Sequence, residues 1–202
     1  MLYKPEKGGL YDMANRKMSP IKDLRKVEGF LRLAQSHGEK YYVIGKFQLN
    51  TGLRIIDVLK IRVSDIMLPS FRFREHLTLK EKKTGKDKQI KLNDELKRCL
   101  KAYVSFNGLS YNGFLFPGRK DGTHITYYQV WRVFTGIAEQ LSLENFATHS
   151  LRKTWGYFSY KASKHNIALI MAMFNHDSER ETLKYIGIDQ DEKDRVYSTV
   201  RF

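Results

Sequence analysis

The spacing of apolar residues restricts the fold of this chain more than any other feature of its sequence. They recur every three or four positions over most of the chain, in segments separated by Gly, Asn and Pro, as in helices that bury one face. The first helix is predicted to begin at Ser19-Pro20, with serine as N-cap and proline at the first helical position, and to end at Gly38. Further helices are predicted over 40–49, from Arg54, from Asn93 to about Val104, from Val130 to Leu141, beyond His149 through Phe174, and after Ser178.

One region departs from this helical pattern. Residues 77–80 and 89–92 read as two short strands on either side of the turn Lys83-Thr84-Gly85-Lys86. The sequence therefore predicts a mainly α fold with one small antiparallel β-sheet, of the α+β class, in a chain whose 202 residues suit one domain with or without a tail.

The chain is strongly basic. It has 36 Lys and Arg against 22 Asp and Glu, a formal net charge of +14. This excess favours a polyanionic partner, because basic side chains displace counterions from phosphates. A generic basic protein or one attracted to anionic lipid would share the composition, but the basic residues surround the candidate site described below, which favours nucleic acid.

The remaining composition indicates a cytoplasmic protein. A single cysteine, Cys99, excludes an internal disulfide and lies in a helical apolar pattern as a core residue. No apolar run has the ~20 residues of a membrane span, and no secretory signal opens the chain.

The segment from His149 to Tyr185 carries the groups that a metal-free attack on a phosphodiester needs. His149 and Arg152 share one face if the segment is helical. His176 follows an apolar run, and Tyr185 comes nine residues later, after a capping box at Ser178. An arginine can neutralise a phosphate, imidazoles can move protons, and a tyrosine can serve as nucleophile if its proton is removed. The histidines lack the spacing of zinc ligands, so no metal site is predicted.

Two groups upstream complete the candidate site. Arg54 follows a turn at the start of a helix, and Asp57 lies on the same face, close enough to hold the guanidinium. An ordinary surface pair would look the same. The predicted hairpin carries a lysine cluster that suits DNA contact, and any one of its lysines could act as a general acid. The lysines expected to bind DNA are Lys82, Lys86, Lys88 and Lys153.

Taken in order, these motifs resemble the tyrosine recombinase (phage integrase) family. They are Thr51-Gly52-Leu53-Arg54 with Asp57, the Lys-Thr-Gly hairpin, His149-Ser150-Leu151-Arg152, His176 and Tyr185. The resemblance implies a catalytic domain over residues 19–202, including a C-terminal tail, preceded by a basic tail or linker remnant at residues 1–18. Family members usually carry an N-terminal DNA-clamping domain, which 18 residues cannot form.

The resemblance also implies a role for each residue. Tyr185 would attack the scissile phosphate to give a 3′-phosphotyrosyl link, with Arg54 and Arg152 on the non-bridging oxygens. Lys83 would protonate the leaving 5′-oxygen, His149 would accept or hold a proton, and His176 would hydrogen-bond the phosphate. Asp57 would support the site, and no metal, nucleotide or other cofactor would be needed.

The implied protein is a site-specific recombinase or integrase of a prokaryote or phage that acts on double-stranded DNA in the cytoplasm. Residues 188–202 would pack on a neighbouring protomer, so that a multimer assembles on DNA. Two alternatives share the fold: a DNA-binding regulator without catalysis, and a type IB topoisomerase-like enzyme that relaxes supercoils. The sequence does not choose among integration, excision and resolution, nor does it specify the DNA site.

Overall fold

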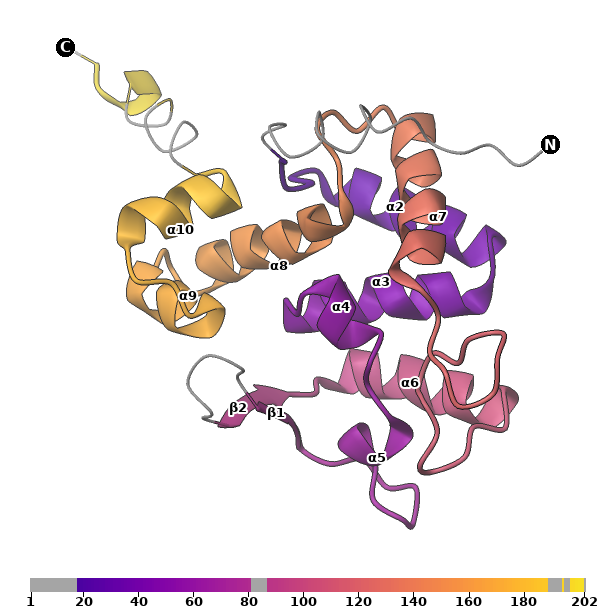
Figure 1. Cartoon of the computed structure of the whole chain (residues 1–202). Coiled ribbons are helices and arrows are strands. Elements are labelled where there is room, and N and C mark those ends of the chain that lie inside the picture. Colours follow the sequence, from indigo (N-terminus) through magenta and orange to yellow (C-terminus); the bar gives the residue numbers. More distant parts are fainter. Residues whose placement is uncertain (1–17, 81–86, 189–193, 195–196, 202) are drawn as a thin grey trace.

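The computed structural model describes residues 18–80, 87–188, 194 and 197–201. Helices dominate this part of the chain, and the only sheet within it is one antiparallel pair, so the predicted α+β class is confirmed (Figure 1). The elements, in chain order, are α2 (Leu24–Ser36), α3 (Glu39–Thr51), α4 (Ile55–Val58), α5 (Val63–Ile66), β1 (His76–Lys80), β2 (Asp87–Lys91), α6 (Asp94–Phe106), α7 (Tyr127–Gln140), α8 (Thr148–Ala162), α9 (Ile167–Phe174) and α10 (Glu179–Ile186).

The hairpin forms where the sequence predicts it. β1 and β2 pair with Leu77 opposite Ile90 and Thr78 opposite Gln89. Leu77 is fully buried, whereas Thr78 is exposed, as expected of a strand with one covered face. The predicted turn, with Lys82, Lys83 and Lys86, lies outside the described residues.

The predicted start of the first helix is wrong by several residues. Asp23, rather than Ser19, is the N-cap of α2, and its carboxylate accepts a hydrogen bond from the backbone of Arg25. The preceding segment is held by distant partners instead. The Ser19 amide donates to the Asn145 carbonyl, and the Ile21 amide donates to the Thr154 hydroxyl at 2.8 Å. These long-range bonds keep the segment non-helical until Asp23.

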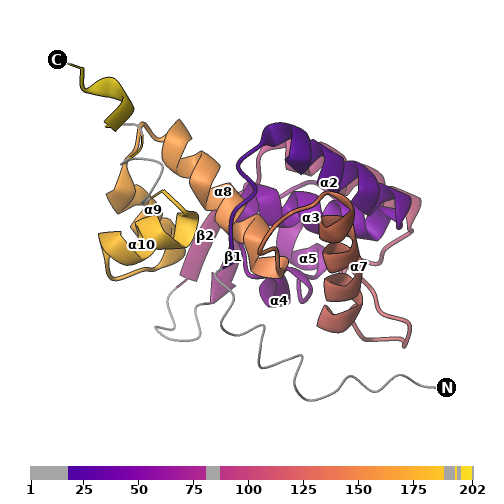
Figure 2. The ribbon, with the colours of Figure 1, turned by 90° about the horizontal axis from the view of Figure 1, so that it is seen from above.

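Two apolar clusters meet along α8. The larger one contains residues of α2, α3, α6, α7 and the start of α8, with Phe30, Phe47 and Phe134 fully buried. The smaller one lies among α8, α9 and α10 and is built on Tyr157, Phe174 and Ile186, among others. Both views show α8 between these two groups of helices (Figures 1 and 2). Because α8 is covered on several sides, even Arg152 and Lys153 in it are buried.

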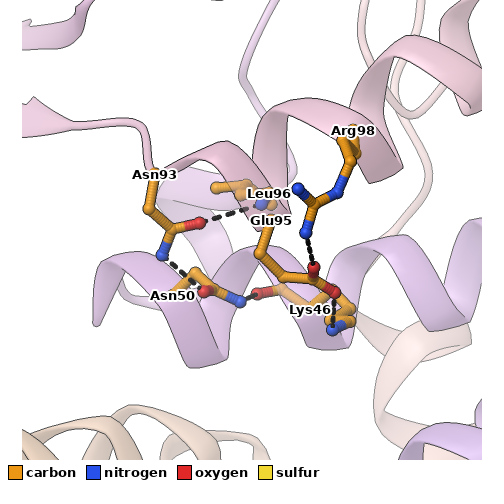
Figure 3. A network of polar contacts seen from close by, with 6 residues as sticks. All are labelled: Lys46, Asn50, Asn93, Glu95, Leu96 and Arg98. Atoms are coloured by element: carbon orange, nitrogen blue, oxygen red, sulfur yellow. Dashed lines mark hydrogen bonds and ion pairs between the residues drawn. The ribbon is translucent and has the colours of Figure 1, made fainter.

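A polar network fastens the base of the hairpin to the end of α3 (Figure 3). Asn93, which follows β2 and caps α6 by accepting from the Leu96 amide, donates to the Asn50 side chain at 2.7 Å. Nearby, Glu95 accepts from Lys46 at 2.8 Å and from Arg98 at 2.6 Å. These hydrogen bonds lower the pKa of Glu95. The network orients the hairpin relative to the turn that follows α3.

In the described part of the chain, no helix combines the length and apolar character needed to cross a membrane.

Candidate active site

The turn between α3 and α4 presents Arg54 at the protein surface. Gly52 has φ 63° and ψ 15°, the left-handed conformation that glycine adopts at low cost. A Cβ at this position would lie 2.1 Å from the Trp155 ring, so the close approach of the turn to α8 also requires glycine. Arg54 is then the N-cap of α4 and is exposed, as the sequence predicts.

Arg152 joins this turn to α8. Its side chain is only 4% exposed, and Nη1 donates to the carbonyl of Gly52, 100 residues away in sequence. The guanidinium has five N–H donors. His149 lies one helical turn earlier on α8 and is half-buried. The segment 51–54 and the segment 149–152, which the sequence predicts to belong to one site, therefore lie together.

Gln48 is a second bridge between the same two segments, and sequence reasoning missed it. Its amide nitrogen donates to the Leu53 carbonyl at 3.3 Å and to the Thr148 carbonyl at 2.9 Å. The side chain is fully buried, and its Oε1 has no hydrogen-bond partner among the described residues. The sequence shows only that residue 48 is polar, which does not reveal that its side chain bonds to Leu53 and Thr148.

Phe174 supports the other side of the site, and sequence reasoning missed this residue too. The Arg152 guanidinium lies 4.5 Å from the centre of the Phe174 ring. The His176 ring stacks on it at 5.2 Å with an interplanar angle of 18°, and the Tyr185 ring meets it edge-on, also at 5.2 Å. Gly156 makes room for the phenyl group, since a Cβ there would lie 2.5 Å from it. The sequence offered one signal for the role of Phe174, namely that it lies two residues before His176.

Tyr185 lies within this group of side chains. Its ring meets the His176 ring at 5.1 Å and 82°. The Lys153 ammonium stands 4.8 Å above the centre of the tyrosine ring and also donates to the Met18 carbonyl at 2.6 Å. Lys153 is 9% exposed, so in this conformation it faces the tyrosine rather than a surface open to DNA. Its predicted role in DNA binding stays a prediction.

The charges of the site act on the two histidines. Burial, together with the nearby Arg152, Arg54 and Lys153, lowers the pKa of His149. Burial also lowers the pKa of His176; there Arg152 and Arg54 add to the effect, while Glu181 and Asp177 oppose it. Both imidazoles are consequently neutral over a wider pH range than a free histidine and are available as proton acceptors.

The groups around Arg152 act on its pKa in opposite directions. Burial lowers the pKa of this guanidinium, and the neighbouring Tyr185 hydroxyl and Asp57 oppose that effect. The expected pairing of Asp57 with Arg54 is not seen, since no ion pair joins these two residues among the described contacts. Asp57 instead contributes negative charge near Arg152.

The hairpin approaches the site near the end of its strands that adjoins the turn. Lys88 on β2 donates to the carbonyl of Met173 in α9, and both views show the strands beside the group formed by α8, α9 and α10 (Figures 1 and 2). Lys82, Lys83 and Lys86 lie beyond β1 in the part of the hairpin outside the described residues, so the identity of the general acid stays a prediction.

Among the described residues, neither Cys99 nor a metal cluster belongs to this site. Cys99 packs against the larger apolar cluster, as predicted, and burial raises the pKa of its thiol to about 11. Within the described residues, no three His, Cys, Asp or Glu side chains gather closely enough to hold a metal ion. The expectation of metal-free chemistry stays a prediction.

The chain is similar to known proteins in both sequence and fold. The sequence pattern described as the phage integrase family matches residues 23–192. The chain is 31% identical over 180 residues to the probable integrase/recombinase YoeC of Bacillus subtilis (strain 168), covering 89% of this chain and 95% of YoeC.

Solved structures share the fold. XerA recombinase superposes with a TM-score of 0.68 at 18% identity, over 92% of this chain and 67% of XerA. XerH recombinase, in a post-cleavage complex with its palindromic difH substrate, gives a TM-score of 0.70 at 19% identity over 92% of this chain. This chain spans about half (54%) of the XerH chain. The chain therefore belongs to the phage integrase family, the site-specific recombinases that its ordered motifs resemble.

Proposed function

We propose that this recombinase cuts and rejoins double-stranded DNA through Tyr185. The phenolate oxygen attacks the scissile phosphorus and forms a 3′-phosphotyrosyl link, while the bond from phosphorus to the 5′-oxygen breaks. The observation that carries this proposal is the convergence of Arg152, His176 and Tyr185 on Phe174. A nucleophile, a cation and an imidazole that can hydrogen-bond the phosphate, all within one cluster, suit phosphoryl transfer to tyrosine.

The two arginines have complementary positions for binding a phosphate. Arg152 uses one donor on Gly52 and stacks on Phe174, so its plane is held while further N–H groups remain for non-bridging oxygens. Arg54 is exposed on the same turn whose carbonyl Arg152 contacts, and it can engage the phosphate as DNA arrives. A guanidinium that is preorganised in this way needs little rearrangement in the transition state.

Cleavage requires one proton to leave Tyr185 and one proton to reach the departing 5′-oxygen. His149, whose pKa is lowered by burial and by neighbouring cations, accepts the phenolic proton directly or through water. Lys83 on the hairpin donates a proton to the departing 5′-oxygen. Rejoining runs these steps in reverse with the 5′-hydroxyl of a partner strand, so the phosphodiester energy is retained in the protein–DNA link.

Covalent trapping on a nicked suicide DNA substrate tests this function. The wild-type chain is expected to form a protein–DNA adduct, and Tyr185→Phe is expected to form none. Tyr128→Phe is the matched control, because Tyr128 is 60% exposed on α7. Arg152→Gln should bind DNA but cleave about 10² to 10³ times more slowly. An adduct that persists in Tyr185→Phe would contradict the choice of nucleophile.

Covalent trapping, together with an assay for relaxation of supercoiled DNA, separates the two alternatives. A DNA-binding regulator would bind the substrate tightly and yield no adduct with the wild-type chain. A topoisomerase-like enzyme would form the adduct and relax supercoiled DNA without exchanging strands between two sites.

We further propose that the C-terminal segment joins protomers on DNA. Its Tyr197 and Val200 are 82% and 55% exposed, and the described residues of this segment lie away from the helices in both views (Figures 1 and 2). The double change Tyr197→Ser with Val200→Ser should leave binding to one half-site intact and remove larger complexes in sedimentation on a full site. Unchanged complexes would contradict this assembly.

The remaining assignments follow from the same proposal. Residues 19–202 act as the catalytic domain, and the protein works on DNA in the cytoplasm of a prokaryote or on behalf of a phage, consistent with its likeness to the Bacillus subtilis protein YoeC.

A further inference from the structure

Thr182 lies behind His176 and touches the edge of its ring that carries Nδ1. The threonine is on α10 and is fully buried. Its hydroxyl has two polar neighbours, the carbonyl oxygen of Ser178 at 2.9 Å and Nδ1 of His176 at 3.1 Å. No reaction step described above uses this hydroxyl.

The number of protons available fixes the direction of both hydrogen bonds. A hydroxyl has one proton to donate, and a carbonyl oxygen can only accept. The threonine proton therefore goes to Ser178, and the hydroxyl oxygen accepts a proton from Nδ1 of His176. If the threonine donated to Nδ1 instead, its oxygen would face the Ser178 carbonyl at 2.9 Å with no proton between the two acceptors.

The ring of His176 is thus held from three sides. Thr182 fixes its Nδ1 edge, Phe174 stacks on its face, and Tyr185 meets it edge-on. Nε2 lies on the part of the ring turned away from Thr182, and no hydrogen bond reaches it from the described residues. Nε2 is therefore the nitrogen left for substrate.

We propose that Thr182 is a positioning residue that holds His176 in the Nδ1–H tautomer, so that Nε2 donates a hydrogen bond to a DNA phosphate only when the ring is an imidazolium. The assignment of the phosphate as partner rests on the proposed function. In the neutral ring, Nε2 carries a lone pair and is a proton acceptor.

The charged groups around His176 come from several elements. They are Glu181 on α10, Asp177 in the preceding loop, Arg152 on α8 and Arg54 at the start of α4. The two arginines and burial disfavour the imidazolium in the free protein. A bound phosphate adds negative charge and raises the pKa of the ring. The hydrogen bond from Nε2 is present below this pKa and is lost as pH rises through it, so the cleavage rate should decline in that range.

Nitrogen NMR of the free protein tests the tautomer without any DNA. At a pH where the ring is neutral, the His176 signals should show a protonated Nδ1 and a bare Nε2, with His176→Gln identifying the resonances by their loss. Thr182→Val removes the acceptor at nearly constant volume and should shift the ring to the Nε2–H tautomer. Thr182→Ser keeps the hydroxyl and should retain the wild-type pattern. A wild-type ring protonated on Nε2, or a ring unaffected by Thr182→Val, would overturn the proposal.

Single-turnover cleavage at saturating DNA tests the consequence. Thr182→Val should cleave roughly ten-fold more slowly near neutral pH, by analogy with the loss of activity when the hydrogen-bond partner of a metal-bound histidine is removed. In this variant the neutral His176 ring carries a proton on Nε2 and can donate it to the phosphate. The cleavage rate of the variant should therefore fall less steeply at alkaline pH than that of the wild type. Thr182→Ser should restore both the rate and the decline. A rate lowered by one factor at every pH would indicate packing alone and would refute the proposal.

The two measurements keep this inference separate from the proposed function. If the wild-type chain forms no covalent adduct but shows the Nδ1–H tautomer, the recombinase mechanism fails while the role of Thr182 in the ring stands. If the adduct forms and the tautomer is Nε2–H, the role of Thr182 fails alone.

Discussion

Phe174 shows how one apolar side chain can organise charged ones. Its ring contacts Arg152, His176 and Tyr185, and it is itself only 2% exposed. An aromatic ring restrains these groups without taking their hydrogen-bonding capacity, because stacking and cation–π contacts leave the N–H donors free. Phe174 can hold this place because residue 156, on α8, is glycine.

A substitution at Gly156 should therefore destabilise the protein. Glycine to alanine inside a helix usually stabilises by about 1 kcal/mol. At this position the new methyl group would lie 2.5 Å from Phe174 and 2.8 Å from Ile186, so Gly156→Ala should instead lower the free energy of unfolding by about 1–3 kcal/mol. Urea unfolding measures the difference.

Gly136 in α7 provides the matched control. A Cβ there meets nothing within 4 Å, so Gly136→Ala should raise the free energy of unfolding by about 0.5–1 kcal/mol. Equal stabilisation by the two substitutions would mean that Phe174 does not need the space at Gly156.

Among the elements, α3 and α8 are joined at the site by polar bridges as well as by packing. Gln48 on α3 contacts the Leu53 and Thr148 carbonyls, and Arg152 on α8 contacts the Gly52 carbonyl. Among the described residues the Oε1 of Gln48 has no partner, and burying a polar atom in this way costs about 1–3 kcal/mol. The amide donors of this residue give a reason for its presence, because they hold together the segments that carry Arg54 and His149.

Replacing Gln48 should slow cleavage more than it weakens DNA binding. Gln48→Met keeps a long side chain but removes both donors, so we expect a loss of about 1–2 kcal/mol in unfolding free energy. The segments that carry Arg54 and His149 would then be held less firmly relative to one another, so the single-turnover cleavage rate should fall roughly ten-fold. The Kd for DNA should change little. Gln35→Met, at an exposed position of α2, is the control. Wild-type cleavage by Gln48→Met would rule out this positioning role.

At the scale of the whole molecule, the excess of basic residues should make DNA binding sensitive to salt. With a formal charge of +14, the protein should release counterions from DNA as it binds. The logarithm of the binding constant should fall by about 0.9 per contacted phosphate for each unit of log salt concentration. Lys80→Gln, at an exposed position of β1, should reduce that slope if the hairpin lies on DNA. Binding that hardly responds to salt would argue against nucleic acid as the partner.

The sequence by itself determined the local structure and the family. The hairpin, the Asn93 cap of α6 and the Ser178 cap of α10 form as predicted because each depends on residues a few positions apart. The order of the motifs from Arg54 to Tyr185 was likewise sufficient for the family, because that order is a property of the chain alone.

Only the tertiary structure decided how these motifs meet. The contacts from Arg152 to Gly52 and from Gln48 to Thr148 each join residues 100 positions apart, and neither partner identifies the other in the sequence. For the same reason, α2 begins after Asp23 rather than at the predicted Ser19. The Ile21 amide donates to Thr154 on α8, a partner that the local sequence does not identify. Periodicity reports which face of a helix is buried, whereas the identity of the buried partner depends on how the helices pack.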